Sequence, residues 1–153
     1  MPSGQKKKKK DDQAPACRVL VAEDDASIRR LLALTLRREG LAVDTARDGV
    51  EAVEFLSKRR YRALISDLMM PKMSGWEVVK WLQSHPDERP NSVIITTAAD
   101  RDVLRDLDPN IVNAIFMKPF NPPDLAVYVN ACCQLRAPDR RRSRLVTDTS
   151  IRI

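Results

Sequence analysis

Three acidic side chains stand directly after short apolar runs, where they could cooperate in chemistry. Glu23 and Asp24 follow the run Arg18–Ala22, and Asp67 follows the run Ala63–Ser66. Carboxylates that lie close together repel one another, and a hard divalent cation relieves that repulsion. Because no histidine or cysteine stands beside them, an oxygen-only site indicates Mg²⁺ or Mn²⁺.

A hydroxyl and an ammonium group follow two further apolar runs. Thr97 follows the run Ser92–Thr96, and Lys118 follows the run Val112–Met117. Together they could grip the oxygens of a phosphoryl group that approaches the cation. The chain has four glycines and no Gly-rich Lys-Ser/Thr element, so we do not expect a bound nucleotide. One carboxylate would instead act as the nucleophile and form an aspartyl phosphate.

The elements that must position these groups alternate along the chain. Short apolar runs predict buried strands over residues 18–22, 41–46, 63–66, 92–96 and 112–117. Helical patterns contain Ile28–Arg38, Ala52–Leu56, Gly75–Ser84, residues 100–107 and Leu125–Cys132. We expect Asp48 and Asn121 to cap the second and fifth helices. The fifth helix is expected to bury Leu125, Val129 and Cys132.

Strict alternation of strands and helices predicts an α/β fold with a parallel sheet that is covered on both faces. In such open sheets, ligands bind outside the carboxyl ends of the strands. The three carboxylates, Thr97 and Lys118 all follow strand ends, so we expect them to converge in one crevice.

Four segments that carry these groups resemble the receiver domain of two-component response regulators, in its chemotaxis-type, single-domain form. They are Val19–Asp25 (VLVAEDD), Ser66–Gly75 (SDLMMPKMSG), Thr97–Ala98 (TA) and Lys118–Phe120 (KPF). The resemblance covers about residues 17–135. It implies a flavodoxin-like, doubly wound, five-stranded parallel sheet with strand order 2-1-3-4-5 and five helices.

The resemblance also implies roles for individual residues. Asp67 would be the phosphoacceptor, Thr97 the switch hydroxyl and Lys118 the partner of the phosphoryl group. Mg²⁺ would be held by Glu23, Asp24, Asp67 and the backbone carbonyl of Met69. The Lys118–Pro119 bond is expected to be cis, as in a tight, specified turn.

Two places differ from the family pattern. The family often has an aromatic residue three positions before the lysine, where this chain has Ile115. Phe116 stands beside it and should point to the other face of the strand. The turn before the fifth strand reads Asp108-Pro109-Asn110 instead of Gly-Ala, so we expect a short fourth helix.

The resemblance implies a regulatory domain rather than an enzyme, although it supports its own phosphoryl transfer and dephosphorylation. Its partner upstream would be a sensor histidine kinase or a histidine phosphotransfer protein. Eighteen residues follow Leu135, too few for a DNA-binding or catalytic output domain. We therefore expect a stand-alone regulator that signals by protein contact through the fourth helix, fifth strand and fifth helix.

Positive charge is concentrated at the two ends of the chain. Residues 1–16 carry five Lys against two Asp, and residues 136–153 carry six Arg against two Asp, whereas residues 17–135 are almost neutral. We expect a basic, disordered N-terminal tail, a central receiver domain and a basic C-terminal tail. Lysine runs alone give only nonspecific, salt-sensitive binding, so a nucleic-acid partner is not favoured.

The remaining composition argues for a cytoplasmic protein. No apolar run is long enough to span a membrane, and no apolar segment of a secretory signal follows the basic start. Cys17, Cys132 and Cys133 lack metal-type spacing and indicate no disulfide scaffold, so a reducing compartment is expected. We expect Cys132 and Cys133 to serve as small apolar helix residues.

Other functions fit the sequence less well. A pseudo-receiver that works without phosphorylation would be favoured by a missing acceptor or lysine, and both are present. A nucleic-acid-binding protein would need a recognition motif, and none is evident. An aspartate-nucleophile phosphatase would need two aspartates around a variable residue after the first strand, where this chain has Glu23-Asp24-Asp25.

Overall fold

The computed structural model describes residues 17–135, and the predicted basic tails lie outside them. The strands are β1 (Arg18–Ala22), β2 (Ala42–Ala46), β3 (Ala63–Asp67), β4 (Ser92–Thr97) and β5 (Ala114–Met117). The helices are α1 (Ala26–Arg38), α2 (Gly49–Lys58), α3 (Gly75–Ser84), α4 (Arg101–Leu104) and α5 (Pro122–Gln134). Strands and helices alternate along the described chain, as the sequence predicts.

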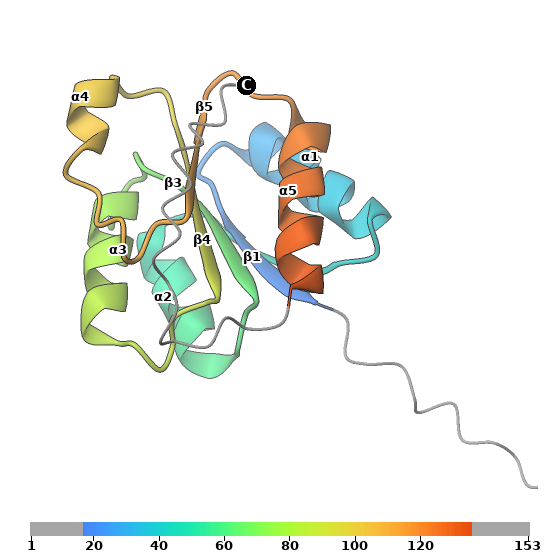
Figure 1. The fold of residues 1–153 in the computed structure, drawn as a ribbon, viewed down its shortest axis with the longest axis horizontal. Coiled ribbons are helices and arrows are strands. Elements are labelled where there is room, and N and C mark those ends of the chain that lie inside the picture. The colour runs from blue at the N-terminus through green and yellow to red at the C-terminus, as the bar shows by residue number, and fades with distance from the viewer. Residues whose placement is uncertain (1–16, 136–153) are drawn as a thin grey trace, which may run out of the picture.

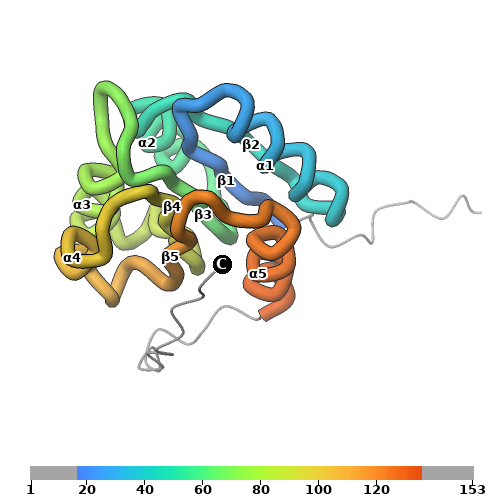
Figure 2. Tube along the Cα trace, turned by 90° about the horizontal axis from the view of Figure 1, so that it is seen from above, coloured from blue at the N-terminus to red at the C-terminus, as the bar shows by residue number. Residues whose placement is uncertain are grey.

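The five strands form one parallel sheet in the order β2-β1-β3-β4-β5, which confirms the predicted fold (Figures 1 and 2). The register aligns Ala22 of β1 with Ser66 of β3, and Asp67 of β3 with Thr96 of β4. All strands therefore end at one edge of the sheet. No helix within residues 17–135 has the length and apolar character that crossing a membrane requires.

Side chains alternate between two apolar layers, one on each face of the sheet. Helices α1 and α5 cover one face, and α2 and α3 cover the other (Figures 1 and 2). The first layer joins Leu32, Leu36, Leu125 and Val129 to Val19, Val21, Ile65, Ile94 and Phe116. The second joins Leu56, Val78 and Leu82 to Leu20, Leu64 and Ile95. Since the three central strands β1, β3 and β4 are covered on both faces, their residues are buried almost throughout.

Several helix starts follow from local chemistry. The side chain of Asp48 accepts a hydrogen bond from the Glu51 amide, as predicted for a cap. Ser74 and Glu77 form a reciprocal capping box at the start of α3. Asn121 occupies the predicted N-cap position of α5, but its side chain makes no capping hydrogen bond. The predicted position is therefore right, and the predicted side-chain cap is wrong.

Some boundaries differ from the sequence prediction. Strand β5 begins at Ala114, because Val112 belongs to a turn in which its amide donates to the Asp108 carbonyl. Helix α4 is shorter than predicted, since it ends at Leu104. Cys132 is only half-buried on α5, not part of the core as predicted.

The expectation of unpaired cysteines was wrong for two of the three. Cys17 and Cys133 form a disulfide across a sequence separation of 116 residues. Their pairing depends on where β1 begins and α5 ends in space, which residue spacing alone does not reveal. Cys132 remains a free thiol.

Candidate functional site

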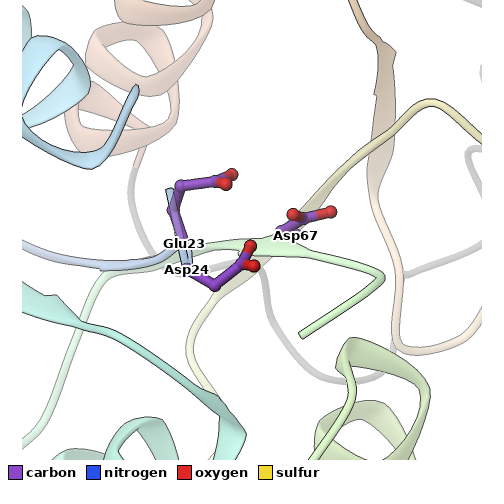
Figure 3. A group of neighbouring side chains, drawn as sticks. All are labelled: Glu23, Asp24 and Asp67. Carbon is purple, nitrogen blue, oxygen red and sulfur yellow. The ribbon is translucent and has the colours of Figure 1, made fainter. Parts of the chain in front are cut away.

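The three predicted acidic residues lie together at the carboxyl edge of the sheet. Glu23 follows β1, and Asp67 ends the adjacent strand β3. Each of Glu23, Asp24 and Asp67 offers a carboxylate oxygen within 4.8 Å of the others. Figure 3 shows the three side chains gathered around a common space. Glu23 and Asp67 are buried, whereas Asp24 is exposed and leaves the cluster open to solvent.

Lys118 joins this cluster from the end of β5. Its Nζ lies 3.1 Å from Glu23 Oε2 and 3.1 Å from Asp67 Oδ2, donating a hydrogen bond to each. Glu23 lies 95 residues before Lys118 in the sequence, and Asp67 lies 51 residues before it. The bond between Lys118 and Pro119 is cis, as predicted. The structure thus brings the predicted lysine directly between two of the predicted carboxylates.

Burial and like charge perturb the acidic cluster. The pKa of Glu23 is raised to about 7, mainly by burial and then by the nearby charge of Asp67, although Lys118 acts in the opposite sense. Burial alone would lower the pKa of Lys118, but its hydrogen bonds to Glu23 and Asp67 raise it above its ordinary value. Three carboxylates therefore face one ammonium group, and negative charge is in excess.

This donor set suits a hard divalent cation. All available donors are oxygens, as Mg²⁺ prefers, and the burial of Glu23 makes the excess negative charge of the cluster costly. A cation would supply charge neutralisation at the cluster. Glu23, Asp24 and Asp67 are the residues that would hold it.

Thr97 ends the intervening strand β4 and is fully buried. Its hydroxyl oxygen accepts a hydrogen bond of 3.0 Å from the Ala99 amide, and its carbonyl accepts one of 2.7 Å from the Lys118 amide. Strand β4 thus fixes both the position of Thr97 and the start of the Lys118 segment. All five predicted side chains belong to the same edge of the sheet.

The loop after β3 wraps closely around Asp67. The Met69 amide lies 3.3 Å from Asp67 Oδ1, which places the Met69 backbone beside this carboxylate. The Gly75 amide donates to the Leu68 carbonyl over 2.8 Å. A Cβ atom at position 75 would collide with the Asp67 carbonyl oxygen and lie 2.7 Å from the Leu68 Cα. Gly75 is therefore required for the close approach of α3 to the Asp67 loop.

The sequence analysis missed Arg29, which hydrogen-bonds the backbone of the acidic pair Glu23-Asp24. Its Nη1 donates to the Glu23 carbonyl over 2.8 Å and to the Asp24 carbonyl over 3.2 Å. Arg29 lies in the first turn of α1, next to the cap formed by Asp25. An arginine one turn after an acidic strand end was the signal available in the sequence.

Ile115 and Phe116, where the sequence differs from the family pattern, lie on opposite faces of the sheet, as predicted. Ile115 packs against the layer of α2 and α3, whereas Phe116 is fully buried in the other layer. The Phe116 ring packs edge-on against Phe120 and Tyr128, with ring centroids 6.4 Å and 5.7 Å apart. Phe116 is thus a core residue under α5.

Comparisons with known proteins agree with this geometry. The chain is 34% identical over 124 residues to the response regulator MprA of Mycobacterium leprae, covering 80% of this chain and 53% of that protein. This chain therefore spans about half the length of the curated relatives it matches.

Solved receiver structures have the same fold. The response regulator TrrA of Thermotoga maritima, solved in complex with Mg(2+)-BeF, superimposes with a TM-score of 0.65 at 31% identity, over 75% of this chain and 97% of that one. The chemotaxis protein CheY4 of Vibrio cholerae gives 0.69 at 30% identity, over 76% and 98%. Residues 19–130 match the family model described as the response regulator receiver domain. The chain therefore belongs to the response regulator receiver domain family.

Proposed function

We propose that this protein accepts a phosphoryl group on Asp67 and passes the signal on by protein contact. The observation that carries the proposal is the position of Lys118 Nζ, 3.1 Å from an oxygen of Asp67 at the edge where Glu23 and Asp24 also lie. Phosphoryl transfer needs a nucleophile for the phosphorus and a positive charge near the phosphoryl oxygens. Asp67 can supply the first and Lys118 the second.

The chemistry follows from the groups at the site. A carboxylate oxygen of Asp67 attacks the phosphorus of a phosphohistidine or of acetyl phosphate. The bond from phosphorus to the donor nitrogen or oxygen breaks, and an aspartyl phosphate forms. Lys118 moves its hydrogen bond from Asp67 to a phosphoryl oxygen, and Thr97 offers its hydroxyl to another. Mg²⁺, held by Glu23, Asp24, Asp67 and the Met69 carbonyl, would neutralise charge during this transfer.

The partner upstream is a sensor histidine kinase or a histidine phosphotransfer protein, because the curated relatives are response regulators. A pseudo-receiver is the alternative, but it gives no reason for a lysine held between two buried carboxylates. We also propose that residues 17–135 form the receiver unit, in a stand-alone, chemotaxis-like regulator located in the cytoplasm.

The proposed output surface consists of α4, β5 and α5. Helix α4 buries none of its residues, and Val103 remains 47% exposed. Asp102 of α4 forms an ion pair of 3.4 Å with Arg105, the residue that follows this helix. Further charges are carried by Asp100, Arg101, Asp106 and Asp108. A partner with both apolar and charged groups fits this surface.

Intact mass after incubation with acetyl phosphate and Mg²⁺ tests the acceptor. We expect the wild type to gain one phosphoryl group, and Asp67→Asn to gain none. Asp106→Asn is the matched control, because this exposed aspartate lies outside the cluster and should leave labelling unchanged. Full labelling of Asp67→Asn would show that the acceptor is a different residue.

Amide hydrogen exchange with and without beryllofluoride tests the output surface. We expect changed protection in residues 97–107, because Thr97 connects the site to the segment that leads into α4. Changes confined to α1 and α2 would contradict the proposed surface.

A further inference from the structure

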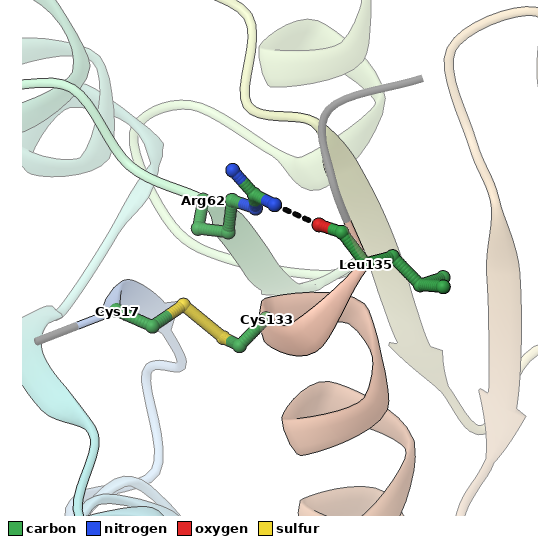
Figure 4. The surroundings of a disulfide bond; sticks show 4 residues. All are labelled: Cys17, Arg62, Cys133 and Leu135. Atoms are coloured by element: carbon green, nitrogen blue, oxygen red, sulfur yellow. Dashed lines mark hydrogen bonds between the residues drawn. A yellow bond between two sulfur atoms is a disulfide. The ribbon is translucent and has the colours of Figure 1, made fainter. Parts of the chain in front are cut away.

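The disulfide between Cys17 and Cys133 joins the two ends of the described fold. Cys17 immediately precedes β1, and Cys133 lies in the last turn of α5. Their Cα atoms are 5.9 Å apart, a separation typical of disulfides (Figure 4). The phosphoacceptor proposal does not use this pair.

The fold itself brings the two sulfurs together. Strand β1 starts at the edge of the sheet opposite to the acidic cluster, and α5 returns to that edge while packing Leu125 and Val129 on the sheet. A second contact ties the same end of α5, because Arg62 Nη2 donates to the Leu135 carbonyl (Figure 4). Contacts other than the disulfide thus also hold the end of α5 at the edge where β1 and β3 begin.

Both cysteines are half-buried, not enclosed in the core. Cys17 and Cys133 pack against the apolar layer under α5, and each residue keeps part of its surface accessible to solvent. Exposure of this kind is typical of cysteines that exchange with solution thiols.

We propose that Cys17 and Cys133 are a reversible redox modification site, oxidised by small-molecule disulfides such as oxidised glutathione. One thiolate attacks a sulfur of glutathione disulfide, forms a mixed disulfide and releases one glutathione. The second thiolate then attacks the protein sulfur and releases the other glutathione. Overall, two thiols lose two electrons and two protons, and one glutathione disulfide becomes two glutathione molecules.

The bond controls how firmly the end of α5 is attached. It closes a loop of more than one hundred residues, so it restricts the unfolded chain strongly. Without the bond, packing and the Arg62 contact are what hold the last turn of α5 to the rest of residues 17–135. The inner part of α5 stays in place, because Tyr128 packs against Phe116 in the core.

The redox site and the acidic cluster are well separated. Cys17 and Glu23 lie at opposite ends of β1, and six residues of extended chain span about 20 Å. Oxidation should therefore change stability and the dynamics of α5 without changing acetyl phosphate labelling of Asp67. This separation makes the redox proposal testable whether or not Asp67 is the acceptor.

The test treats the full chain with reduced and with oxidised glutathione. Intact mass should show the loss of two hydrogens, and peptide mapping should link Cys17 to Cys133. The oxidised protein should melt about 10 °C higher. Amides of residues 131–135 should exchange at least about tenfold more slowly in the oxidised form.

Serine variants provide the controls. Cys132→Ser is matched to Cys133→Ser, because the two cysteines are neighbours on the same helix and both are half-buried. Cys132→Ser should keep the full response, whereas Cys17→Ser and Cys133→Ser should each lose it. Because reduced and oxidised wild type are compared directly, the result does not depend on how well the variants fold.

Three results would overturn the proposal. They are a cross-link that involves Cys132, a glutathione adduct that never resolves to the internal bond, and equal melting and exchange in both redox states.

Discussion

Glu23→Gln should make the metal-free protein more stable above neutral pH, although Glu23 is a proposed ligand. Glu23 is 1% exposed and lies beside Asp67, and its pKa is raised from 4.5 to about 7. Each pKa unit corresponds to about 1.4 kcal/mol. The ionised carboxylate therefore costs the folded state up to about 3 kcal/mol, and glutamine removes that cost.

The pH window follows from the direction of this shift. Below about pH 4.5 the carboxyl is neutral in both states and costs nothing. Between about 4.5 and 7 the unfolded chain releases the proton while the folded protein retains it, so stability falls as pH rises. Above about 7 the penalty is complete. Glutamine cannot form the ion pair with Lys118, so we expect a net gain of about 1–3 kcal/mol at about pH 8.

Urea unfolding of wild type and Glu23→Gln across this pH range measures the difference. The two proteins should match near pH 4.5 and diverge as pH rises. Saturating Mg²⁺ should then stabilise the wild type by mass action and have much less effect on the variant.

Asp24→Asn is the matched control, because this carboxylate is exposed. It should lose Mg²⁺ stabilisation yet leave the metal-free stability within about 0.5 kcal/mol of wild type. If Glu23→Gln is equally or less stable than wild type near pH 8 without metal, or if the two pH curves run parallel, the reasoning about burial and charge is refuted.

Three further predictions concern the same edge of the sheet. Lys118→Met should lose about 2–4 kcal/mol of stability near pH 8, because Glu23 and Asp67 lose their cation, and the loss measured by urea unfolding should shrink near pH 5 as Glu23 binds a proton. Gly75→Ala should slow acetyl phosphate labelling by displacing the Asp67 loop, whereas Gly40→Ala, at a positive φ of 82°, should destabilise the protein with labelling unchanged. A beryllofluoride-bound structure should show no large rotation of the buried Phe116 ring, and a swing of that ring would refute its assignment to the core.

Much of the site could be predicted from the sequence because parallel strands end at one edge. Once the apolar runs ending before Glu23 and at Asp67 are assigned as strands, their convergence follows from the fold class. The partners of Lys118 do not follow in the same way. Its Nζ contacts Glu23 as well as Asp67, so the lysine side chain must reach across β4 to Asp67 and past β3 to Glu23.

Helix patterns predicted which segments are helical better than which side chains are buried. The helical pattern over Ile28–Arg38 predicted α1, yet within it Leu31 is 51% exposed while Leu32 is buried. The buried residues of α1 are Leu32, Ala33 and Leu36, because these are the side chains that face the sheet in the folded protein. The spacing of apolar residues predicts that a segment is helical, but it does not determine how the helix is rotated about its axis and hence which side chains face the sheet.

The disulfide was the largest omission, and the fold contained a signal for it. In a parallel sheet each helix runs back to the edge where strands begin, so the end of α5 must lie near the start of some strand. Strand order places β1 next to the centre of the sheet, and the shared apolar layer places α5 on the same face as Val19. Cysteines at position 17, just before the first strand, and at position 133, in the last turn of the last helix, were therefore candidates to meet. Spacing rules treat cysteines as local motifs, whereas this pair is made adjacent only by topology.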